Sequence, residues 1–220
     1  MSDRAALRQR LVAGLAELAL EPPPGAIECL LDYVDLLVQW NRAYNLTAVR
    51  EPGDMLSRHL LDSLSITPWV RGSSLADLGS GAGLPGIPLA IFAPRRRVLL
   101  VDSNGKKARF LREAGRQLGL TNVEVAESRV EDVRGMFDCV TARAFTSLAD
   151  MLDRGAQLLA ADGRWLALKG RFPHDELADV PAAFVVESVD AIAVPGLDAE
   201  RHVVVIRHAD NLAIRESIAP

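Results

Sequence analysis

The spacing of hydrophobic residues changes near residue 66 and divides the chain into two parts. In the first part, leucines recur three and four residues apart, as expected for an amphipathic helix: Leu7, Leu11, Leu15 and Leu18. The proline-rich segment 22–25 interrupts this pattern. A longer helix follows it, and a third helix is predicted to start after Pro52. We expect residues 1–66 to form a helical cap that covers one edge of a sheet.

Short apolar segments alternate with helical segments in the second part. Strands are predicted at 74–78, 97–102, 123–126, 137–142 and 164–169. Helical segments are predicted after the first strand and at 104–118, 129–133 and 147–159. This alternation is typical of a parallel sheet with crossover helices.

The C-terminal part of the chain changes character again. Two long apolar segments, 184–194 and 202–208, predict an antiparallel hairpin that closes one edge of the sheet. The predicted fold class is therefore α/β, with a Rossmann-like, mostly parallel twisted sheet in a domain spanning 67–209. The pattern assigns no role to a tail at 210–220.

The composition excludes several classes of protein. The 220 residues are 49% hydrophobic and contain two cysteines, too few for a disulfide framework or a zinc site. The four histidines lack metal-ligand spacing, so no metal site is expected. No apolar run is long enough to span a membrane, and Met1–Arg4 does not resemble a signal peptide, so a cytoplasmic protein is expected. The net charge of −4 requires any nucleic-acid contact to use locally concentrated basic residues.

A glycine turn at residues 79–86 is the strongest candidate for a ligand site. It follows the first predicted strand directly and leads into a helix, which is the arrangement of a nucleotide-binding turn. Read from the end of the strand, the pattern is Asp77-Leu78-Gly79, with glycines again at Gly81 and Gly83. A carboxylate at Asp77 suits a ligand with a cationic amino-acid end, such as S-adenosylmethionine. Two alternatives stay open: a dinucleotide site that uses the Gly81 register, or a turn that binds nothing.

Four further positions lie where an open α/β sheet binds ligands. Asp102 ends the second strand and could accept hydrogen bonds from ribose hydroxyls, or cap the following helix. Segment 129–132 would lie near an adenine ring, or be ordinary solvated charge. Arg143 and Lys169 end the fourth and fifth strands, where they could contact RNA phosphates; the alternative is that they are surface cations.

Several motifs together resemble one family, the bacterial 16S ribosomal RNA guanine-N7 methyltransferases, also called glucose-inhibited division protein B. The resemblance lies in the following segments: Asn41–Thr47, Arg58–Ser63, Gly79–Gly86, Asp102–Ser103, Lys106, Arg109–Leu111, Ser128–Glu131, Arg143–Phe145, Leu168–Gly170 and Glu200–Ile206. It covers nearly the whole chain and is specific as a set.

The resemblance implies a class I methyltransferase fold and methylation of N7 of one guanine in the small ribosomal subunit, with S-adenosyl-L-methionine as cofactor. We also expect the protein to be a monomer. The cofactor contacts that we expect, from motif and position together, are Asp77, Gly79, Gly81, Gly83, Leu84, Asp102, Val130, Glu131 and Arg143. The expected RNA contacts are Arg58, His59, Arg129, Arg143 and Lys169.

The chemistry of N7 predicts that no residue acts as a general base. N7 carries an in-plane lone pair and is unprotonated at neutral pH, so catalysis requires positioning and accommodation of charge. Arg143 and Lys169 are the expected positioning residues. The fourth strand ends in Thr141-Ala142-Arg143, without the Pro-Pro-aromatic motif expected for methylation of an exocyclic amine. The alternatives are a small-molecule methyltransferase, a dinucleotide-dependent oxidoreductase and a non-catalytic ribosome-assembly factor.

Overall fold

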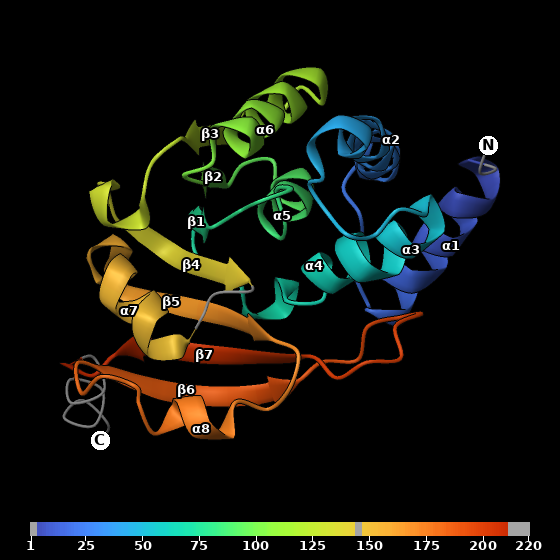
Figure 1. Ribbon diagram of the computed structural model, residues 1–220. Helices are drawn as coiled ribbons and strands as arrows, with labels where there is room; N and C mark the ends of the chain where they lie inside the picture. Colours follow the sequence, from blue (N-terminus) through green and yellow to red (C-terminus); the bar gives the residue numbers. More distant parts are fainter. Residues whose placement is uncertain (1–3, 144–146, 211–220) are drawn as a thin grey trace.

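A seven-stranded sheet forms the centre of the protein (Figure 1). The computed structural model describes residues 4–143 and 147–210. The strands are β1 (Ser74–Leu78), β2 (Arg97–Val101), β3 (Val123–Ala126), β4 (Phe137–Arg143), β5 (Leu159–Lys169), β6 (Phe184–Ala191) and β7 (His202–His208). Their order is β3-β2-β1-β4-β5-β7-β6.

The first five strands pair in parallel, and β7 pairs antiparallel with both β5 and β6. The predicted α/β fold and the C-terminal hairpin at one edge are therefore confirmed. Four boundaries differ: β2 ends at Val101 and β4 at Arg143, each one residue from the predicted end. β5 begins at Leu159, five residues before the predicted start, and β6 ends at Ala191, three residues before the predicted end. Beyond Asp210 the predicted tail lies outside the described residues.

Helices cover both faces of the sheet (Figure 1). The larger ones are α1 (Arg4–Glu17), α2 (Ala26–Tyr44), α5 (Gly86–Phe92), α6 (Gly105–Gln117) and α7 (Leu148–Gly155). The short ones are α3 (Pro52–Met55), the π-helical η1 (Leu56–Leu61), α4 (Asp62–Leu64), η2 (Thr67–Trp69), η3 (Val130–Asp132), η4 (Ala156–Leu158) and α8 (His174–Leu177). The helix expected at 147–159 ends before β5 begins, and α8 was not predicted.

The N-terminal helices pack on one face of the sheet, not on its edge as predicted. Side chains of a strand alternate between the two faces. Leu75 and Leu100 accordingly join the core cluster that also contains leucines of α1 and α2, such as Leu11 and Leu30. Ala76 and its neighbours on the other face pack against α7. The helices thus share one continuous core with the sheet and cover the face on which α5 and α6 lie.

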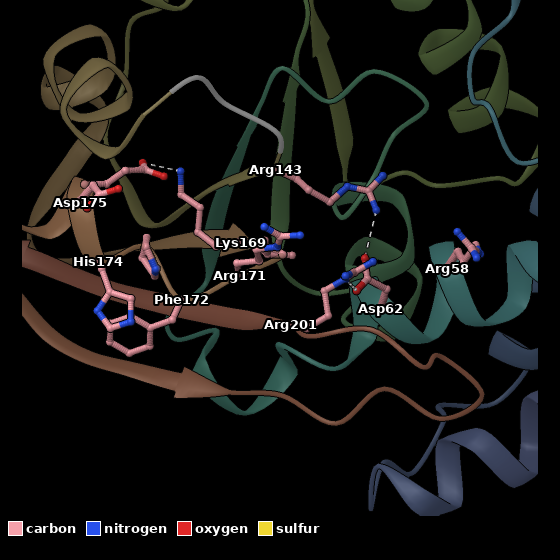
Figure 2. Close-up of a pocket in the computed structure, with 13 residues that line it drawn as sticks. Arg58, Asp62, Arg143, Lys169, Arg171, Phe172, His174, Asp175 and Arg201 are labelled. Carbon is pink, nitrogen blue, oxygen red and sulfur yellow. Dashed lines mark hydrogen bonds and ion pairs between the residues drawn. The ribbon is translucent and has the colours of Figure 1, made fainter.

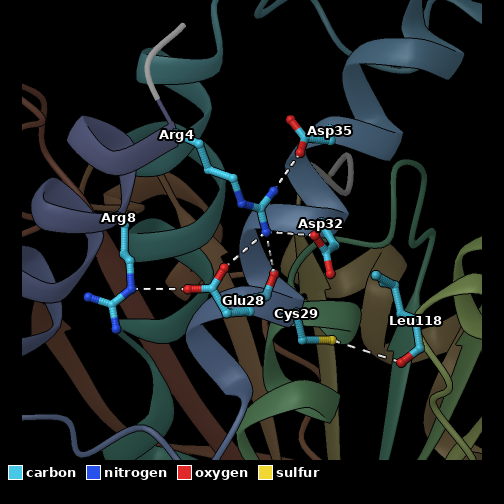
Figure 3. Close-up of polar contacts among 7 residues, drawn as sticks. All are labelled: Arg4, Arg8, Glu28, Cys29, Asp32, Asp35 and Leu118. Atoms are coloured by element: carbon cyan, nitrogen blue, oxygen red, sulfur yellow. Dashed lines mark hydrogen bonds and ion pairs between the residues drawn. The ribbon is translucent and has the colours of Figure 1, made fainter.

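A surface ion-pair network joins α1 to α2 (Figure 3). The Arg4 guanidinium lies 3.1, 2.6 and 2.7 Å from the carboxylates of Glu28, Asp32 and Asp35. The Arg4 side chain is 43% exposed, so solvent screens each pair and the network adds little to stability. The buried leucines between the helices therefore contribute most of the contact that holds α1 against α2.

Among the described residues, no helix is both long and apolar enough to cross a membrane.

Candidate active site

The glycine turn after β1 has the sharp backbone that the sequence predicted. Gly79, Gly81 and Gly83 have φ values of 67°, 58° and 87°, which residues with a Cβ adopt only at a cost. The turn is closed by hydrogen bonds to the Ser80 carbonyl from the amides of Gly83 and Leu84, at 2.7 and 3.0 Å. The backbone therefore reverses directly at the end of the strand and leads into α5.

Asp77 supports this turn from inside the protein. Its carboxylate is fully buried and accepts hydrogen bonds from the Gly86 amide and the Thr141 hydroxyl, both at 3.1 Å. Burial raises the pKa of Asp77 to about 6, although hydrogen bonds from Ser80, Gly86 and Thr141 oppose the shift. The expectation that Asp77 contacts the cationic end of a ligand is wrong for this arrangement, because the carboxylate bonds to the turn and has no exposed surface.

The helical cap contacts the same turn through Tyr33. The hydroxyl of this buried side chain on α2 donates a 2.6 Å hydrogen bond to the Ala82 carbonyl. Burial raises the pKa of Tyr33, so the phenol stays protonated and remains a donor. This role was not predicted, because an amphipathic pattern places Tyr33 on the apolar face without indicating which group its hydroxyl contacts.

A cleft of about 280 Å³ lies at the carboxyl ends of β1 and β2. This β1–β2 cleft is lined by Gly79, Val101, Asp102, Ser103, Ser128, Arg129, Val130, Glu131 and Arg154. The structure thus brings together five residues predicted for the site from three separate segments. Gly81, Gly83 and Leu84 do not line the cleft; they shape the turn beside it, and Leu84 is buried in the core.

Asp102 lines the cleft, and backbone amides use only some of the hydrogen-bond acceptor sites of its carboxylate. One oxygen accepts from the Gly81 amide at 2.9 Å and the other from the Asn104 amide at 2.8 Å. Each carboxylate oxygen offers about two acceptor sites, so Asp102 can still accept from two ribose hydroxyls. The alternative role as helix cap is excluded, because the side chain of Asn104 caps α6 by accepting from the amides of Lys106 and Lys107.

The residues of the β1–β2 cleft fit an adenosine ligand. The Asp102 carboxylate and Gly79 of the glycine turn line the cleft together with Val130 and Glu131 of η3. Glu131 is held by Arg154, whose Nη1 lies 3.0 Å from its Oε1. Among the described residues, no cluster of three or more histidine, cysteine or carboxylate side chains could hold a metal ion.

A second, larger pocket lies beside the cleft at the carboxyl ends of β4 and β5 (Figure 2). This β4–β5 pocket has a volume of about 710 Å³. It is lined by Arg58, Asp62, Arg143, Leu168, Lys169, Gly170, Arg171, Phe172, Pro173, His174, Asp175, Glu176 and Arg201. Five cationic side chains face three carboxylates, an excess of two positive charges in a chain whose net charge is −4. The basic residues are therefore concentrated locally.

Arg143 lies between the two sites. Leu78 of β1 pairs with Ala142 of β4, so Gly79 and Arg143 follow neighbouring strand ends. The charge of Arg143 also acts on the buried carboxylate of Asp77 below the turn.

Asp62 and Arg201 line the β4–β5 pocket, although neither was predicted as a site residue. Asp62 lies 3.2 Å from Arg143 and 2.8 Å from Arg201. Both residues stand inside segments that carried the family resemblance, and this was the only signal for them. Lys169 forms an ion pair with Glu176 of α8 at 2.7 Å, so the unpredicted short helix positions one of the predicted site residues.

His59 is not at the surface of this pocket. It is 5% exposed, and its Nε2 lies 2.9 Å from the Thr47 hydroxyl. Burial lowers the pKa of His59. The expectation that His59 contacts RNA is therefore wrong: the side chain links η1 to the loop after α2. Its neighbour Arg58 lines the pocket, and its contact with RNA stays a prediction.

Comparison with known proteins gives a consistent result over most of the chain. A family model described as GidB, rRNA small subunit methyltransferase G, matches residues 26–204. A relative from Stenotrophomonas maltophilia (strain K279a), named ribosomal RNA small subunit methyltransferase G, is 53% identical over 207 residues, covering 93% of this chain and 95% of that protein. A relative of the same name from Ectopseudomonas mendocina (strain ymp) is 49% identical, covering 91% and 96%.

Solved structures are similar in fold at much lower sequence identity. A mutant of MtNAS in complex with S-adenosylmethionine aligns with a TM-score of 0.55 and 16% identity, over 80% of this chain and 72% of that one. TrmN from Thermus thermophilus aligns with a TM-score of 0.54 and 20% identity, over 70% and 53%. At these identities the comparison establishes the shared fold alone.

Proposed function

Because the chain belongs to the GidB family of rRNA small subunit methyltransferases, we propose that it transfers a methyl group from S-adenosylmethionine to N7 of one guanine in 16S ribosomal RNA. The resemblance carried by the sequence motifs is thereby confirmed at the level of the family. The observation that carries the proposal is the pair of adjoining sites along one edge of the sheet, with Arg143 between them. One site fits an adenosine ligand, and the other is cationic.

S-adenosylmethionine would occupy the β1–β2 cleft. Asp102 would accept hydrogen bonds from its ribose hydroxyls, while the amides of Val130 and Glu131 would face its adenine. Gly79, Gly81 and Gly83 have no side chains, so the backbone of the turn could approach the cofactor closely. Asp77 acts indirectly in this scheme by holding the turn through Gly86.

When bound, S-adenosylmethionine supplies an electrophilic methyl group on a positively charged sulfur. The attacking N7 already has a free lone pair at neutral pH, so the protein need not remove a proton. Its contribution is alignment of the base and accommodation of the charge that the base acquires. The described part of the β4–β5 pocket offers arginines and Lys169 for this alignment, and none of them need act as a base.

RNA would occupy the β4–β5 pocket. The positive excess there suits phosphodiester groups, and Arg58, Arg143 and Lys169 are the proposed contacts. Arg129 lies in the neighbouring β1–β2 cleft and would contact RNA only at the boundary between the two sites. Binding through phosphates predicts strong weakening by salt, because counterions are released on association.

Transfer of tritiated methyl groups to small ribosomal subunits that lack the modification tests the proposal. We expect labelled 16S RNA, with the label mapped to N7 of a single guanine. Labelling of a small molecule from a cell extract but not of subunits would favour a small-molecule methyltransferase. Binding of NADH in place of S-adenosylmethionine would favour the oxidoreductase. Subunit binding without transfer would favour an assembly factor.

We propose further that the protein works as a monomer in the cytoplasm, where ribosomal subunits are assembled. Light scattering during gel filtration should give a mass near 23.8 kDa. A mass twice as large would contradict the monomer.

A further inference from the structure

We infer that Asp62, Arg143 and Arg201 form a phosphate clamp. In this clamp the guanidinium groups of Arg143 and Arg201 bind one phosphodiester of the substrate RNA, and Asp62 is a positioning residue that holds the two together. The inference rests on the proposed function, because it takes RNA as the substrate. It adds a binding residue, Arg201, and an indirect role for Asp62 that the sequence did not indicate.

The clamp is built around one buried carboxylate (Figure 2). Oδ2 of Asp62 accepts from Nη1 of Arg143 at 3.2 Å, and Oδ1 accepts from Nε of Arg201 at 2.8 Å. The Asp62 side chain is 5% exposed, whereas those of Arg143 and Arg201 are 26% and 27% exposed. A carboxylate this buried requires charged partners, and here each oxygen has one. The negative group therefore lies behind the two positive groups, which reach the pocket.

The charge and the donors of the clamp match a phosphodiester. Two guanidinium groups against one carboxylate leave one positive charge, equal and opposite to that of a single phosphodiester. Each guanidinium carries five N–H donors in one plane. Asp62 uses one from each arginine, and Arg201 gives one more to the Glu200 carbonyl. Donors therefore remain on both groups for the bidentate contacts that arginine makes with phosphate.

Three distant segments supply the clamp, so it exists only in the folded protein. Asp62 begins α4 directly after the π-helical segment η1, Arg143 ends β4, and Arg201 precedes β7. A π-helical turn shifts side chains relative to a regular helix and is common at functional sites. Arg58, one turn earlier, lines the same pocket and has no ion pair with any described carboxylate. It is free to contact a neighbouring phosphate.

The clamp could instead bind a different anion, the carboxylate of the methionine part of the cofactor. Arg143 adjoins the glycine turn, so this alternative is chemically reasonable for that residue. Arg201 comes from the opposite side of the pocket, beyond Lys169 on β5, which pairs with His202 on β7. The two anions belong to different ligands, so separate binding measurements distinguish them.

Substitution of Arg201 with alanine tests the clamp directly. We expect the KM for unmodified small subunits to rise about tenfold, as for loss of one charge-assisted hydrogen-bonded contact. The plot of log(kcat/KM) against log[salt] should become shallower by about one. The dissociation constant for S-adenosylhomocysteine, measured by calorimetry, should change less than twofold. Arg8→Ala is the matched control, because Arg8 is also ion-paired, with Glu28, but lies on α1 away from the pocket.

Asp62→Asn tests the positioning role. It should raise the KM for subunits in the same direction, and combining it with Arg201→Ala should add less than the sum of the two effects, since Asp62 acts through the arginines. Arg201→Lys, which keeps the charge but not the planar fork, should fold normally and weaken RNA binding by a smaller factor. If Arg201→Ala does not fold, Arg201→Lys is the variant that tests the clamp.

Several outcomes would overturn the clamp. An unchanged salt slope in folded Arg201→Ala, or unchanged subunit binding in Arg201→Lys, would show that Arg201 does not bind phosphate. Binding of S-adenosylhomocysteine weakened tenfold, with unchanged binding of subunits, would assign the arginines to the cofactor. Subunit binding is also measured without any methyl donor. A wild type that binds subunits through Arg201 but transfers no methyl group would therefore refute the proposed function and leave the clamp standing.

Discussion

Replacing Gly83 with alanine should destabilise the protein far more than replacing Gly81, although both glycines lie in the same turn. Both have positive φ, 87° for Gly83 and 58° for Gly81, so alanine at either position adopts a left-handed backbone at a cost of about 1 kcal/mol. The two positions differ in what surrounds the new methyl group.

At Gly83 the space for a methyl group is already filled. A Cβ there would overlap Cδ1 of Ile87, lie 2.8 Å from its Cγ1 and lie 3.1 Å from Cδ2 of Leu111. Both side chains are fully buried, so relief requires repacking of the core, which costs about 1–3 kcal/mol more. At Gly81 the nearest atom would be the Gly79 carbonyl oxygen at 3.7 Å, an ordinary contact. We expect losses of about 2–4 kcal/mol for Gly83→Ala and about 1 kcal/mol for Gly81→Ala.

Urea unfolding of wild type and both variants, followed by circular dichroism, gives the free energies of unfolding. Equal losses at the two positions would refute this reasoning, because they would mean that backbone strain alone sets the cost. A loss below about 1 kcal/mol for Gly83→Ala would show that the side chains around Ile87 repack without a cost in the free energy of unfolding. Binding of S-adenosylhomocysteine to Gly81→Ala then measures whether a methyl group on the turn obstructs a ligand while the fold stays intact.

Three further predictions concern the buried supports of the site. Tyr33→Phe leaves the Ala82 carbonyl without its 2.6 Å hydrogen bond and should cost about 1–3 kcal/mol in urea unfolding; no loss would show that water replaces the phenol. For Asp77, a folded pKa of about 6 against an ordinary 3.8 means that the native state binds the proton more tightly. Its contribution to stability is therefore fully present below pH 3.8 and lost as the pH rises through 6. Wild type should lose about 3 kcal/mol relative to Asp77→Asn between pH 3.5 and 7, and a constant difference between them would contradict the raised pKa. Asp102→Ala should weaken S-adenosylhomocysteine binding at least about tenfold in calorimetry, and unchanged affinity would remove Asp102 from the cofactor site.

The local pattern of the sequence determined the secondary structure around the site. The alternation of apolar segments predicted the strands 74–78 and 123–126 with the boundaries that the structure has. The spacing of Gly79, Gly81 and Gly83 predicted a sharp turn, and all three have positive φ. These features depend on backbone sterics and on the side-chain period within a few residues, which is information that a short stretch of sequence carries.

Burial was decided by the tertiary structure. Asp77 and His59 are polar residues in promising motifs, and both are closed off from solvent. Asp77 is covered because Thr141 of a strand 64 residues away and the start of α5 pack over its carboxylate. The position of the helical cap on a face of the sheet likewise depends on which apolar surfaces meet, and many surfaces of similar composition compete for that contact.

By itself the sequence determined that this chain forms an α/β fold with a mostly parallel sheet and a sharp glycine turn at its first crossover. It also determined the family, because many short motifs matched together. Only the tertiary structure paired Asp62 with Arg201, which are 139 residues apart, and Tyr33 with Ala82. Such pairs depend on the path of the whole chain in space, and nothing in the residues next to either partner specifies the other.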